Sequence, residues 1–306
     1  MNMQKNETLL TLNDQQEQIN QLSQEISSGV KLASPSDDPS AWAQVMNIQQ
    51  SQREYKSFLN GISFATGWGQ ATESALSQLS DLVSQAKQIA ITGSSANSTS
   101  ENASLASEVN GILQQVVTLA NSQYGDQYIF AGTSTTTAPF SIDGSTGKVN
   151  YSGDSNSITV KTGSGNASNG GSTVVNLTGD QVFNYSSGGS TLNVLHEIWG
   201  LKQAIQTGDS ATISSKLTTL DDAFNHINNE ATTVGSMLSG LTTRQSAISA
   251  FQTNEQSTLS NLQDADMASA AIKLQQVQTA FQSALHVTSM LGNLNLASYL
   301  SGSSTA

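Results

Sequence analysis

The sequence predicts a mainly α-helical protein: an elongated antiparallel helical bundle or coiled coil formed by the N- and C-terminal arms, with a small β-rich domain inserted between them. Apolar residues at both ends recur with a 3-4 spacing, which is the period of an amphipathic helix. Between residues 128 and 185 short β-type segments replace this period, broken by Gly, Ser, Thr and Asn clusters. Helical arms that flank an insertion most simply return to pair, so both chain ends are expected to lie together.

The N-terminal arm begins with two helices joined by a short loop. Apolar residues keep a helical spacing over residues 9–26, and Gly29 supplies a C-terminal cap. Asp38 can cap the next helix, and Pro39 fits its first turn, where a missing N–H costs nothing. The pattern of this second helix blurs around three glycines and becomes clear again over residues 70–92.

Three further helices are expected over residues 105–119, 213–248 and 267–291, each with apolar residues at a 3-4 spacing. In the middle one the seam persists over five heptad-like repeats, which is typical of a coiled coil. The β segments between the arms are expected at residues 128–130, 149–151, 157–160 and 173–177.

The composition excludes several classes of function. Only 11% of the 306 residues are charged, whereas about 25% are charged in an average soluble domain. Asp and Glu number 23 against 11 Lys and Arg, which gives a net charge of −12. So few cations cannot neutralise a run of phosphates or attach to anionic lipid, so neither nucleic acid nor a membrane is an expected partner. The absence of Cys excludes disulfides, thiolate metal sites and Cys nucleophiles.

The location of the protein is constrained by what the sequence lacks. No run approaches the roughly 20 apolar residues that span a bilayer. The start of the chain, residues 1–7, is polar, and no apolar segment of a secretory signal peptide follows it. The sequence therefore favours either a cytoplasmic protein or export by a route that uses no cleaved hydrophobic signal.

No catalytic constellation stands out. The histidines His196, His226 and His286 form no pair at i,i+4, which argues against a zinc site. The carboxylates at residues 37–38 and 264–266 fit helix capping better than acid–base chemistry, because negative charge is stabilised where a helix starts. We expect no catalytic residues, no metal site and no cofactor.

The terminal helices have narrow apolar seams and few charges, so each helix is expected to be only marginally stable by itself. Two interpretations stay open: the seams pair within the chain and close the fold, or they complete their core only against other subunits. Under the second interpretation, the expected packing residues of the N-terminal helix are Leu9, Leu12, Ile19, Leu22 and Ile26. Those of the C-terminal helix are Leu274, Val277, Phe281, Leu285 and Leu291.

Several motifs resemble the bacterial flagellin superfamily. They are the Gln-Leu-Ser-Gln-Glu-Ile-Ser-Ser-Gly run at residues 21–29, Ser-Pro-Ser-Asp-Asp-Pro at 34–39, Phe-Ala-Gly-Thr at 130–133, Asp-Ala-Asp-Met-Ala at 264–268 and the closing Tyr-Leu at 299–300. The form of the Ser-Pro-Ser-Asp-Asp-Pro run resembles the members that join hook to filament more than the filament subunits. The similarity covers nearly the whole chain and is weakest over residues 141–195.

The resemblance implies a non-enzymatic structural adaptor of the flagellum, exported by the flagellar type III apparatus and located outside the cell where the hook meets the filament. The implied partners are copies of itself in a ring, a neighbouring hook-associated protein, flagellin and an export chaperone. It also implies three layers: terminal helices of an inner tube domain at 1–39 and 263–306, a rod-like helical domain at 40–126 and 192–262, and a β-rich outer domain at 127–191.

Two other functions are compatible with the sequence. One is that of filament flagellin itself, which polymerises with its own copies. The other is that of a secreted flagellin-like adhesin, whose binding site would lie in the insertion. An enzyme carried on such helices is disfavoured, because residues 141–195 contain no His, no Arg and no Glu.

Overall fold

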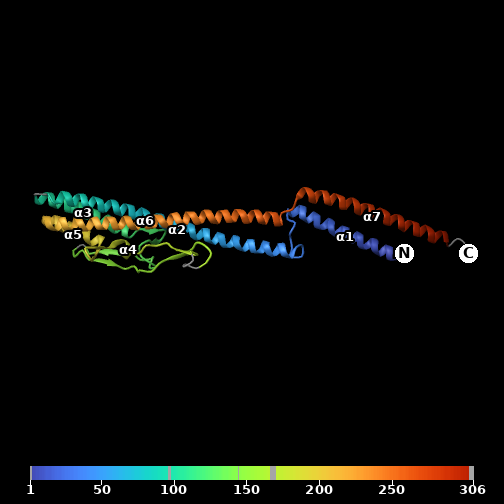
Figure 1. Ribbon diagram of the computed structural model, residues 1–306, viewed down its shortest axis with the longest axis horizontal. Coiled ribbons are helices and arrows are strands. Elements are labelled where there is room, and N and C mark those ends of the chain that lie inside the picture. Colours follow the sequence, from blue (N-terminus) through green and yellow to red (C-terminus); the bar gives the residue numbers. More distant parts are fainter. Residues whose placement is uncertain (1, 96–97, 144, 166–169, 303–306) are drawn as a thin grey trace. The chain divides into compact units, whose positions relative to one another are not determined.

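The computed structural model describes residues 2–95, 98–143, 145–165 and 170–302, and side chains between residues 6 and 290 of these ranges. The helices are α1 (Asn2–Ser28), α2 (Pro39–Gly93), α3 (Thr99–Ala120), α4 (Gly179–Phe183), α5 (Val194–Thr207), α6 (Ser210–Gln263) and α7 (Met267–Gly302) (Figure 1). The strands are β1 (Gln123–Tyr124), β2 (Gln127–Tyr128), β3 (Phe140–Ile142), β4 (Val149–Tyr151), β5 (Thr159–Lys161), β6 (Ser172–Val174), β7 (Asn184–Ser187) and β8 (Ser190–Asn193). The predicted class, mainly α with a small β-rich insertion, is confirmed, and the strands pair in small antiparallel sheets.

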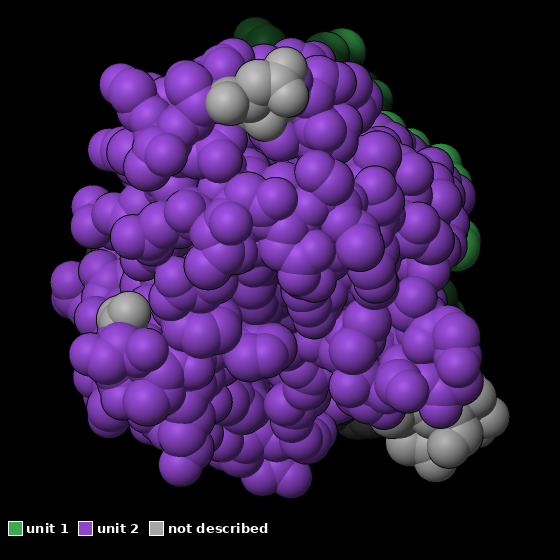
Figure 2. All heavy atoms as spheres, turned by 90° about the vertical axis from the view of Figure 1, so that its left-hand side faces the viewer, with its two compact units in different colours: residues 1–53, 251–306 green, residues 54–250 purple. Residues whose placement is uncertain are grey.

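The chain divides into two compact units. The first contains residues 1–53 and 251–306, and the second contains residues 54–250 (Figure 2). The long helices α2 and α6 each begin in one unit and end in the other.

In the first unit α1 packs against α7 (Figure 1), so the two terminal arms do return to pair. Gly29 ends α1 with a φ of +72°, a left-handed conformation that glycine adopts without strain. The loop after α1 is then tied to the end of α6. The backbone N–H of Lys31 donates to Gln263 O at 2.8 Å, and that of Ala265 donates to Gly29 O at 2.9 Å. The connection between α1 and α2 is thus hydrogen-bonded to the connection between α6 and α7, and the two together form a joint.

α2 is one continuous helix of 55 residues, including the stretch in which the apolar pattern blurs. Its glycines are explained by close contacts with other elements. A Cβ at Gly61 would collide with the backbone O of Lys161, and one at Gly67 would collide with the hydroxyl of Tyr124. The apolar pattern blurs here because other elements approach so closely that only glycine, which has no side chain, fits. Apolar periodicity does not reveal this kind of packing.

The heptad seam predicted for residues 213–248 is confirmed in α6. Its buried apolar residues recur every seven positions, at Ile213, Leu220, Ile227, Val234, Leu241 and Ile248. They belong to the core of the second unit, which α2, α3 and α5 also build. Trp68 of α2 is fully buried in it, with its ring centroid 5.8 Å from that of Phe64 and 6.1 Å from that of Tyr124.

Over residues 123–193, as far as the structure describes them, the strands form four two-stranded antiparallel sheets, paired β1–β2, β3–β4, β5–β6 and β7–β8. The segment expected at 149–151 is β4, and those at 157–160 and 173–177 overlap β5 and β6. The expected strand at 128–130 was wrong for Ile129 and Phe130, which lie in a turn and are buried. Buried apolar residues next to a strand share the apolar signal of the strand without its hydrogen bonds. β3 and the β7–β8 hairpin were not expected.

The β5–β6 hairpin is fastened to two helices of the second unit. Arg244 of α6 donates to Thr162 Oγ1 at 3.3 Å and also to the carbonyl O of Gly170. The ammonium group of Lys161 lies 5.3 Å from the ring centroid of Phe58 on α2. The insertion also contributes the rings of Phe130, Phe140 and Phe183 to the same hydrophobic core as the helices. The domain boundaries expected from the sequence stay a prediction.

Candidate functional site

The first candidate site is the seam where α1 meets α7, because most of the predicted packing residues lie there. Leu12 is buried, with 8% of its surface exposed. Six others are half-buried: Ile19, Leu22, Ile26, Leu274, Val277 and Phe281. Leu22 and Val277 line one groove of about 290 Å³ together with polar side chains of both helices. α1 and α7 thus pack against each other and share the groove at Leu22 and Val277, as the first of the two interpretations requires.

The remaining three predicted packing residues are not on this seam. Leu9 is 47% exposed and Leu285 is 45% exposed. The side chain of Leu291 lies outside the described residues. Leu9 and Leu285 are thus available to a partner, whereas the seam residues are shared between the chain's own helices.

Sequence reasoning missed a second set of apolar residues on the terminal helices. Leu10 is 63% exposed, Ile272 60%, Val287 54% and Met290 59%. On α7 the signal was a second stripe at 3-4 spacing, which starts at Ile272 and reaches Met290. Polar residues fill the middle of that stripe, so its apolar ends did not stand out in the sequence.

Asp38 and Asp266 cap helices, as the sequence predicted, whereas Asp264 accepts the hydroxyl of Ser260 at the end of α6 and caps no helix. Asp38 accepts the backbone N–H groups of Ser40 and Ala41 at the start of α2, at 2.9 and 3.0 Å. Asp266 accepts those of Ala268 and Ser269 at the start of α7, both at 3.1 Å. Asp37 accepts from the backbone of the preceding loop, chiefly from Ser34, and these bonds hold the pKa of Asp37 below its ordinary value.

The histidines of the second unit have structural partners. A ring nitrogen of His196 lies 3.0 Å from Gly147 O, and the ring stacks on Trp199. Nε2 of His226 lies 2.7 Å from Gln181 O. Among the described residues, no group of three or more His, Asp or Glu side chains has an arrangement that would hold a metal ion. Over the same part of the chain, no helix combines the length and apolar character of a membrane span.

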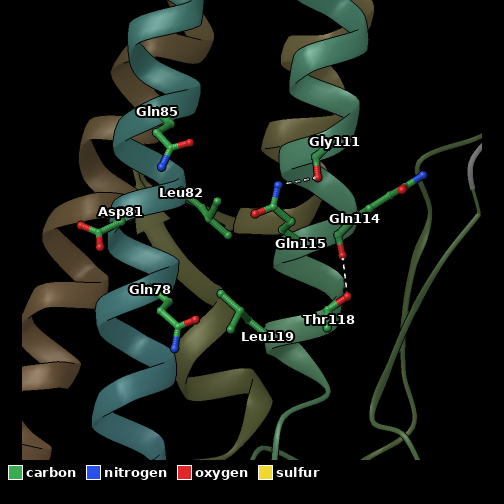
Figure 3. Close-up of a pocket in the computed structure, with 9 residues that line it drawn as sticks. All are labelled: Gln78, Asp81, Leu82, Gln85, Gly111, Gln114, Gln115, Thr118 and Leu119. Carbon is green, nitrogen blue, oxygen red and sulfur yellow. Dashed lines mark hydrogen bonds between the residues drawn. The ribbon is translucent and has the colours of Figure 1, made fainter.

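The second candidate site is a groove of about 740 Å³ between α2 and α3 (Figure 3). Leu82 and Leu119 lie between the two helices, and glutamine side chains of both helices surround them. Gln115 donates to the carbonyl O of Gly111 at 3.4 Å, so one amide is engaged within its own helix. The lining contains one carboxylate, Asp81, and no cation. A groove of this kind offers hydrogen bonds to an uncharged polar partner but no catalytic pair.

The chain matches two family models, which describe the bacterial flagellin N-terminal helical region over residues 1–135 and the C-terminal helical region over residues 217–300. A flagellar hook-associated protein 3 of Salmonella typhimurium is 30% identical over 282 residues, covering 85% of this chain and 86% of that protein. The chain belongs to the family of flagellar hook-associated protein 3. A second relative in the wider superfamily, flagellin FljM of Caulobacter vibrioides, is 25% identical over 300 residues, covering 96% of this chain and 93% of that protein.

The fold of the hook-associated family also appears among solved structures. A putative flagellar hook-associated protein from Vibrio parahaemolyticus superposes with a TM-score of 0.66 at 20% identity, covering 74% of this chain and 100% of that one. At this identity the likeness concerns the fold alone. It agrees with the helices and small sheets described above.

Proposed function

We propose that this chain is a non-enzymatic structural adaptor of the bacterial flagellum, placed between the hook and the filament outside the cell. The observation that carries the proposal is the similarity to a hook-associated protein 3 along 85% of the chain. The paired terminal helices and their capped joint are consistent with a part that acts by packing.

The proposed mechanism is assembly of copies into a ring through the terminal helices. The seam between α1 and α7 is only half-buried, whereas α6 has side chains such as Leu220 and Ile227 with 0% exposure in the second unit. A pair this open gains stability when neighbours cover it, because apolar surface is then removed from water. The predicted packing residues, including the exposed Leu9 and Leu285, would take part in that covering. The further partners proposed are a neighbouring hook-associated protein, flagellin and an export chaperone.

A deletion strain tests the function directly. Cells that lack the gene are expected to keep their hooks, to lose their filaments and to release flagellin into the medium. Restoration of filaments by the wild-type gene on a plasmid is the control. Normal filaments in the deletion strain would overturn the proposal.

Filament flagellin is a second candidate, favoured by the match to flagellin FljM over 96% of the chain. Purified protein distinguishes the two. A flagellin elongates into long filaments when seeds are added, whereas a junction adaptor adds to hook ends and stops after a short layer. Seeded growth of long filaments from this chain alone would support flagellin instead.

A further inference from the structure

One end of the second unit is built from α2 and α6 only, as far as its helices are concerned. The two helices are antiparallel (Figure 1), and Ser80 of α2 hydrogen bonds to Asn228 of α6 at 3.3 Å. Counting along both helices from that pair, residues 58–61 of α2 lie level with residues 247–250 of α6. We call these two segments the two-helix stretch.

As far as the structure describes the chain, neither α3 nor α5 reaches the two-helix stretch. α3 ends at Ala120, and its last turn lines a groove together with Gln78 of α2 (Figure 3). Residues 58–61 lie about 17 residues, or roughly 25 Å, further along α2. α5 covers only the first turns of α6, where Glu197 accepts from Thr219 at 2.6 Å. The two-helix stretch therefore needs another element to cover its apolar core.

The β5–β6 hairpin lies across this stretch and contacts α2 through β5. The ammonium group of Lys161 lies 5.3 Å from the ring centroid of Phe58, which is only 3% exposed. The backbone O of Lys161 and the side chain of Val160 approach Gly61 so closely that no Cβ fits there. Ile158 and Val160 also pack against the core that contains Phe58. The hairpin thus forms a third wall of the core where α3 and α5 are absent.

Arg244 of α6 holds the far ends of both strands of this hairpin. Its Nη1 donates to Thr162 Oγ1 at 3.3 Å, directly after β5, and to the carbonyl O of Gly170, shortly before β6. Thr162 is 1% exposed, and its hydroxyl lies 2.8 Å from that of Thr173 in β6. Hydrogen bonds from a charged donor are stronger than neutral ones, and a guanidinium stays charged at every ordinary pH.

The base of the hairpin is fixed without Arg244. Asn176, which is 5% exposed, accepts the backbone N–H of Ile158 at 2.7 Å and donates to Asn156 O at 3.1 Å. The hairpin between this base and Arg244 is weak by itself, because β5 and β6 have three residues each and a lone hairpin is marginally stable. Its outer side is open, with Val174 47% exposed.

We propose that the β5–β6 hairpin is a strap over the two-helix stretch, with Asn176 as its fixed base and Arg244 as its clasp. With the clasp engaged, the strap holds α2 and α6 together and covers Phe58. With the clasp released, the hairpin swings about its base and the two helices separate locally, while the rest of the unit stays folded. The strap is a property of the folded chain, so it goes beyond the proposed function and its test does not depend on that function.

Paired spin labels test the strap, because the chain has no Cys of its own. Full-length protein is labelled at two introduced cysteines, and electron paramagnetic resonance measures the distribution of distances between the labels. Thr159→Cys with Ala247→Cys reports the hairpin on α6. Gln88→Cys with Ser215→Cys reports α2 and α6 where α3 and α5 flank them. All four positions are exposed, so the labels disturb no buried contact.

Arg244→Gln releases the clasp. The strap pair is expected to change from one narrow distance to a broad distribution with a longer component, whereas the pair at positions 88 and 215 keeps its wild-type distribution. Arg244→Lys retains a charged donor on a flexible stem, so it is expected to recover part of the narrow distance. The matched control is Lys56→Gln, which removes a positive charge from an exposed position of α2 and should change neither pair.

Two results would overturn the proposal. An unchanged strap distance in Arg244→Gln would mean that the hairpin stays closed without its clasp. Equal broadening of both pairs would mean that the whole unit loosens and that the strap is no separate device. Thr162→Val repeats the test with a milder change, because it removes one acceptor of Arg244 and keeps the shape of the side chain. It should give a smaller shift of the strap distance in the same direction, and a shift in neither variant would refute the clasp.

Hydrogen–deuterium exchange provides a second readout, on the helix beneath the strap. In Arg244→Gln, backbone amides over residues 58–66 of α2 are expected to exchange at least tenfold faster than in wild type, because their apolar cover is lost. The amides of α5 are expected to keep their wild-type rates. Equal acceleration in α5, or no acceleration over residues 58–66, would count against the strap.

Discussion

The carboxylate of Asp154 accepts two hydrogen bonds from Thr133, one from the backbone N–H of Thr133 at 2.9 Å and one from the hydroxyl of Thr133 at 2.6 Å. The same carboxylate accepts the backbone N–H of Asn156 at 2.9 Å and the hydroxyl of Ser134 at 3.0 Å. Charge-assisted hydrogen bonds of this kind are the stronger ones, and here they join positions 21 residues apart. The Phe-Ala-Gly-Thr segment, which resembles the superfamily, is therefore fixed by an acid in the insertion.

The first prediction concerns Asp154 and pH. Hydrogen bonds from Thr133 chiefly, and from Asn156 and Ser134, hold the pKa of Asp154 well below its ordinary value. A depressed folded-state pKa means that the contribution to stability is fully present above the unfolded value of about 3.9 and is lost as pH falls below it. Asp154→Asn should therefore lower the Tm at pH 7, and the difference from wild type should shrink toward pH 2. Thermal melts over this pH range measure it.

Asp143→Asn is the matched control for that experiment. Asp143 also has a lowered pKa, but its carboxylate accepts from Ser145 and Thr146 within its own turn. Its replacement loses only local bonds and should change the Tm less than Asp154→Asn does. Equal effects of the two variants would show that the long-range link is unimportant.

The second prediction concerns two glycines inside helices. Gly61→Ala is expected to destabilise the protein by about 1–3 kcal/mol, because the added methyl group meets the backbone O of Lys161 and overpacking must shift the β5–β6 hairpin. Gly111→Ala is expected to stabilise it by about 0.5–1 kcal/mol, because nothing lies within 4 Å of the new Cβ and alanine favours a helix. Urea denaturation of both variants checks the opposite signs. Destabilisation by Gly111→Ala would contradict this account.

The helical part of the fold was predictable because its determinants are local. Gly29 and Asp38 end and begin helices by interactions within a few residues, and the seam of α6 repeats every seven positions from Ile213 to Ile248. The docking of the insertion was not predictable, since it depends on contacts such as that of Arg244 with Thr162, 82 residues apart. No local pattern in the sequence marks such a pair.

The candidate site was predictable only in part. Periodicity identified Leu12, Leu274 and Phe281 as packing residues, but periodicity is the same whether the partner is the chain's own helix or a neighbour. Exposure separates the two cases, since the seam residues are buried or half-buried while Leu10 and Met290 are exposed. The second stripe of α7, from Ile272 to Met290, escaped detection because the residues between its apolar ends are polar.

The third prediction compares two ion pairs. Glu197 is 2% exposed and accepts from Lys216 at 2.9 Å and from the hydroxyl of Thr219 at 2.6 Å. Lys216→Met leaves that carboxylate buried without its cation and should destabilise the protein by about 3 kcal/mol. Lys87→Met breaks a pair with Asp221, which is 53% exposed, and should cost about 1 kcal/mol or less. Urea denaturation measures the loss in the free energy of unfolding for both variants. Similar losses would show that the burial of the carboxylate does not determine the strength of the effect.

The fourth prediction concerns the order of the terminal helices before assembly. In a verified monomer, backbone amides of α1 and α7 should exchange about 100-fold faster than those of α5, because local stability falls where few apolar side chains are fully buried. α5 buries Leu195, Ile198, Leu201 and Ile205 with 0% exposure, whereas Phe281 and Val277 on the seam stay half-exposed. Hydrogen–deuterium exchange with mass spectrometry, on monomer and on assembled flagella, measures the difference. Protection of α1 and α7 should rise on assembly, since neighbours then cover both helices. Equal protection of α1, α7 and α5 in the monomer would contradict ordering coupled to assembly.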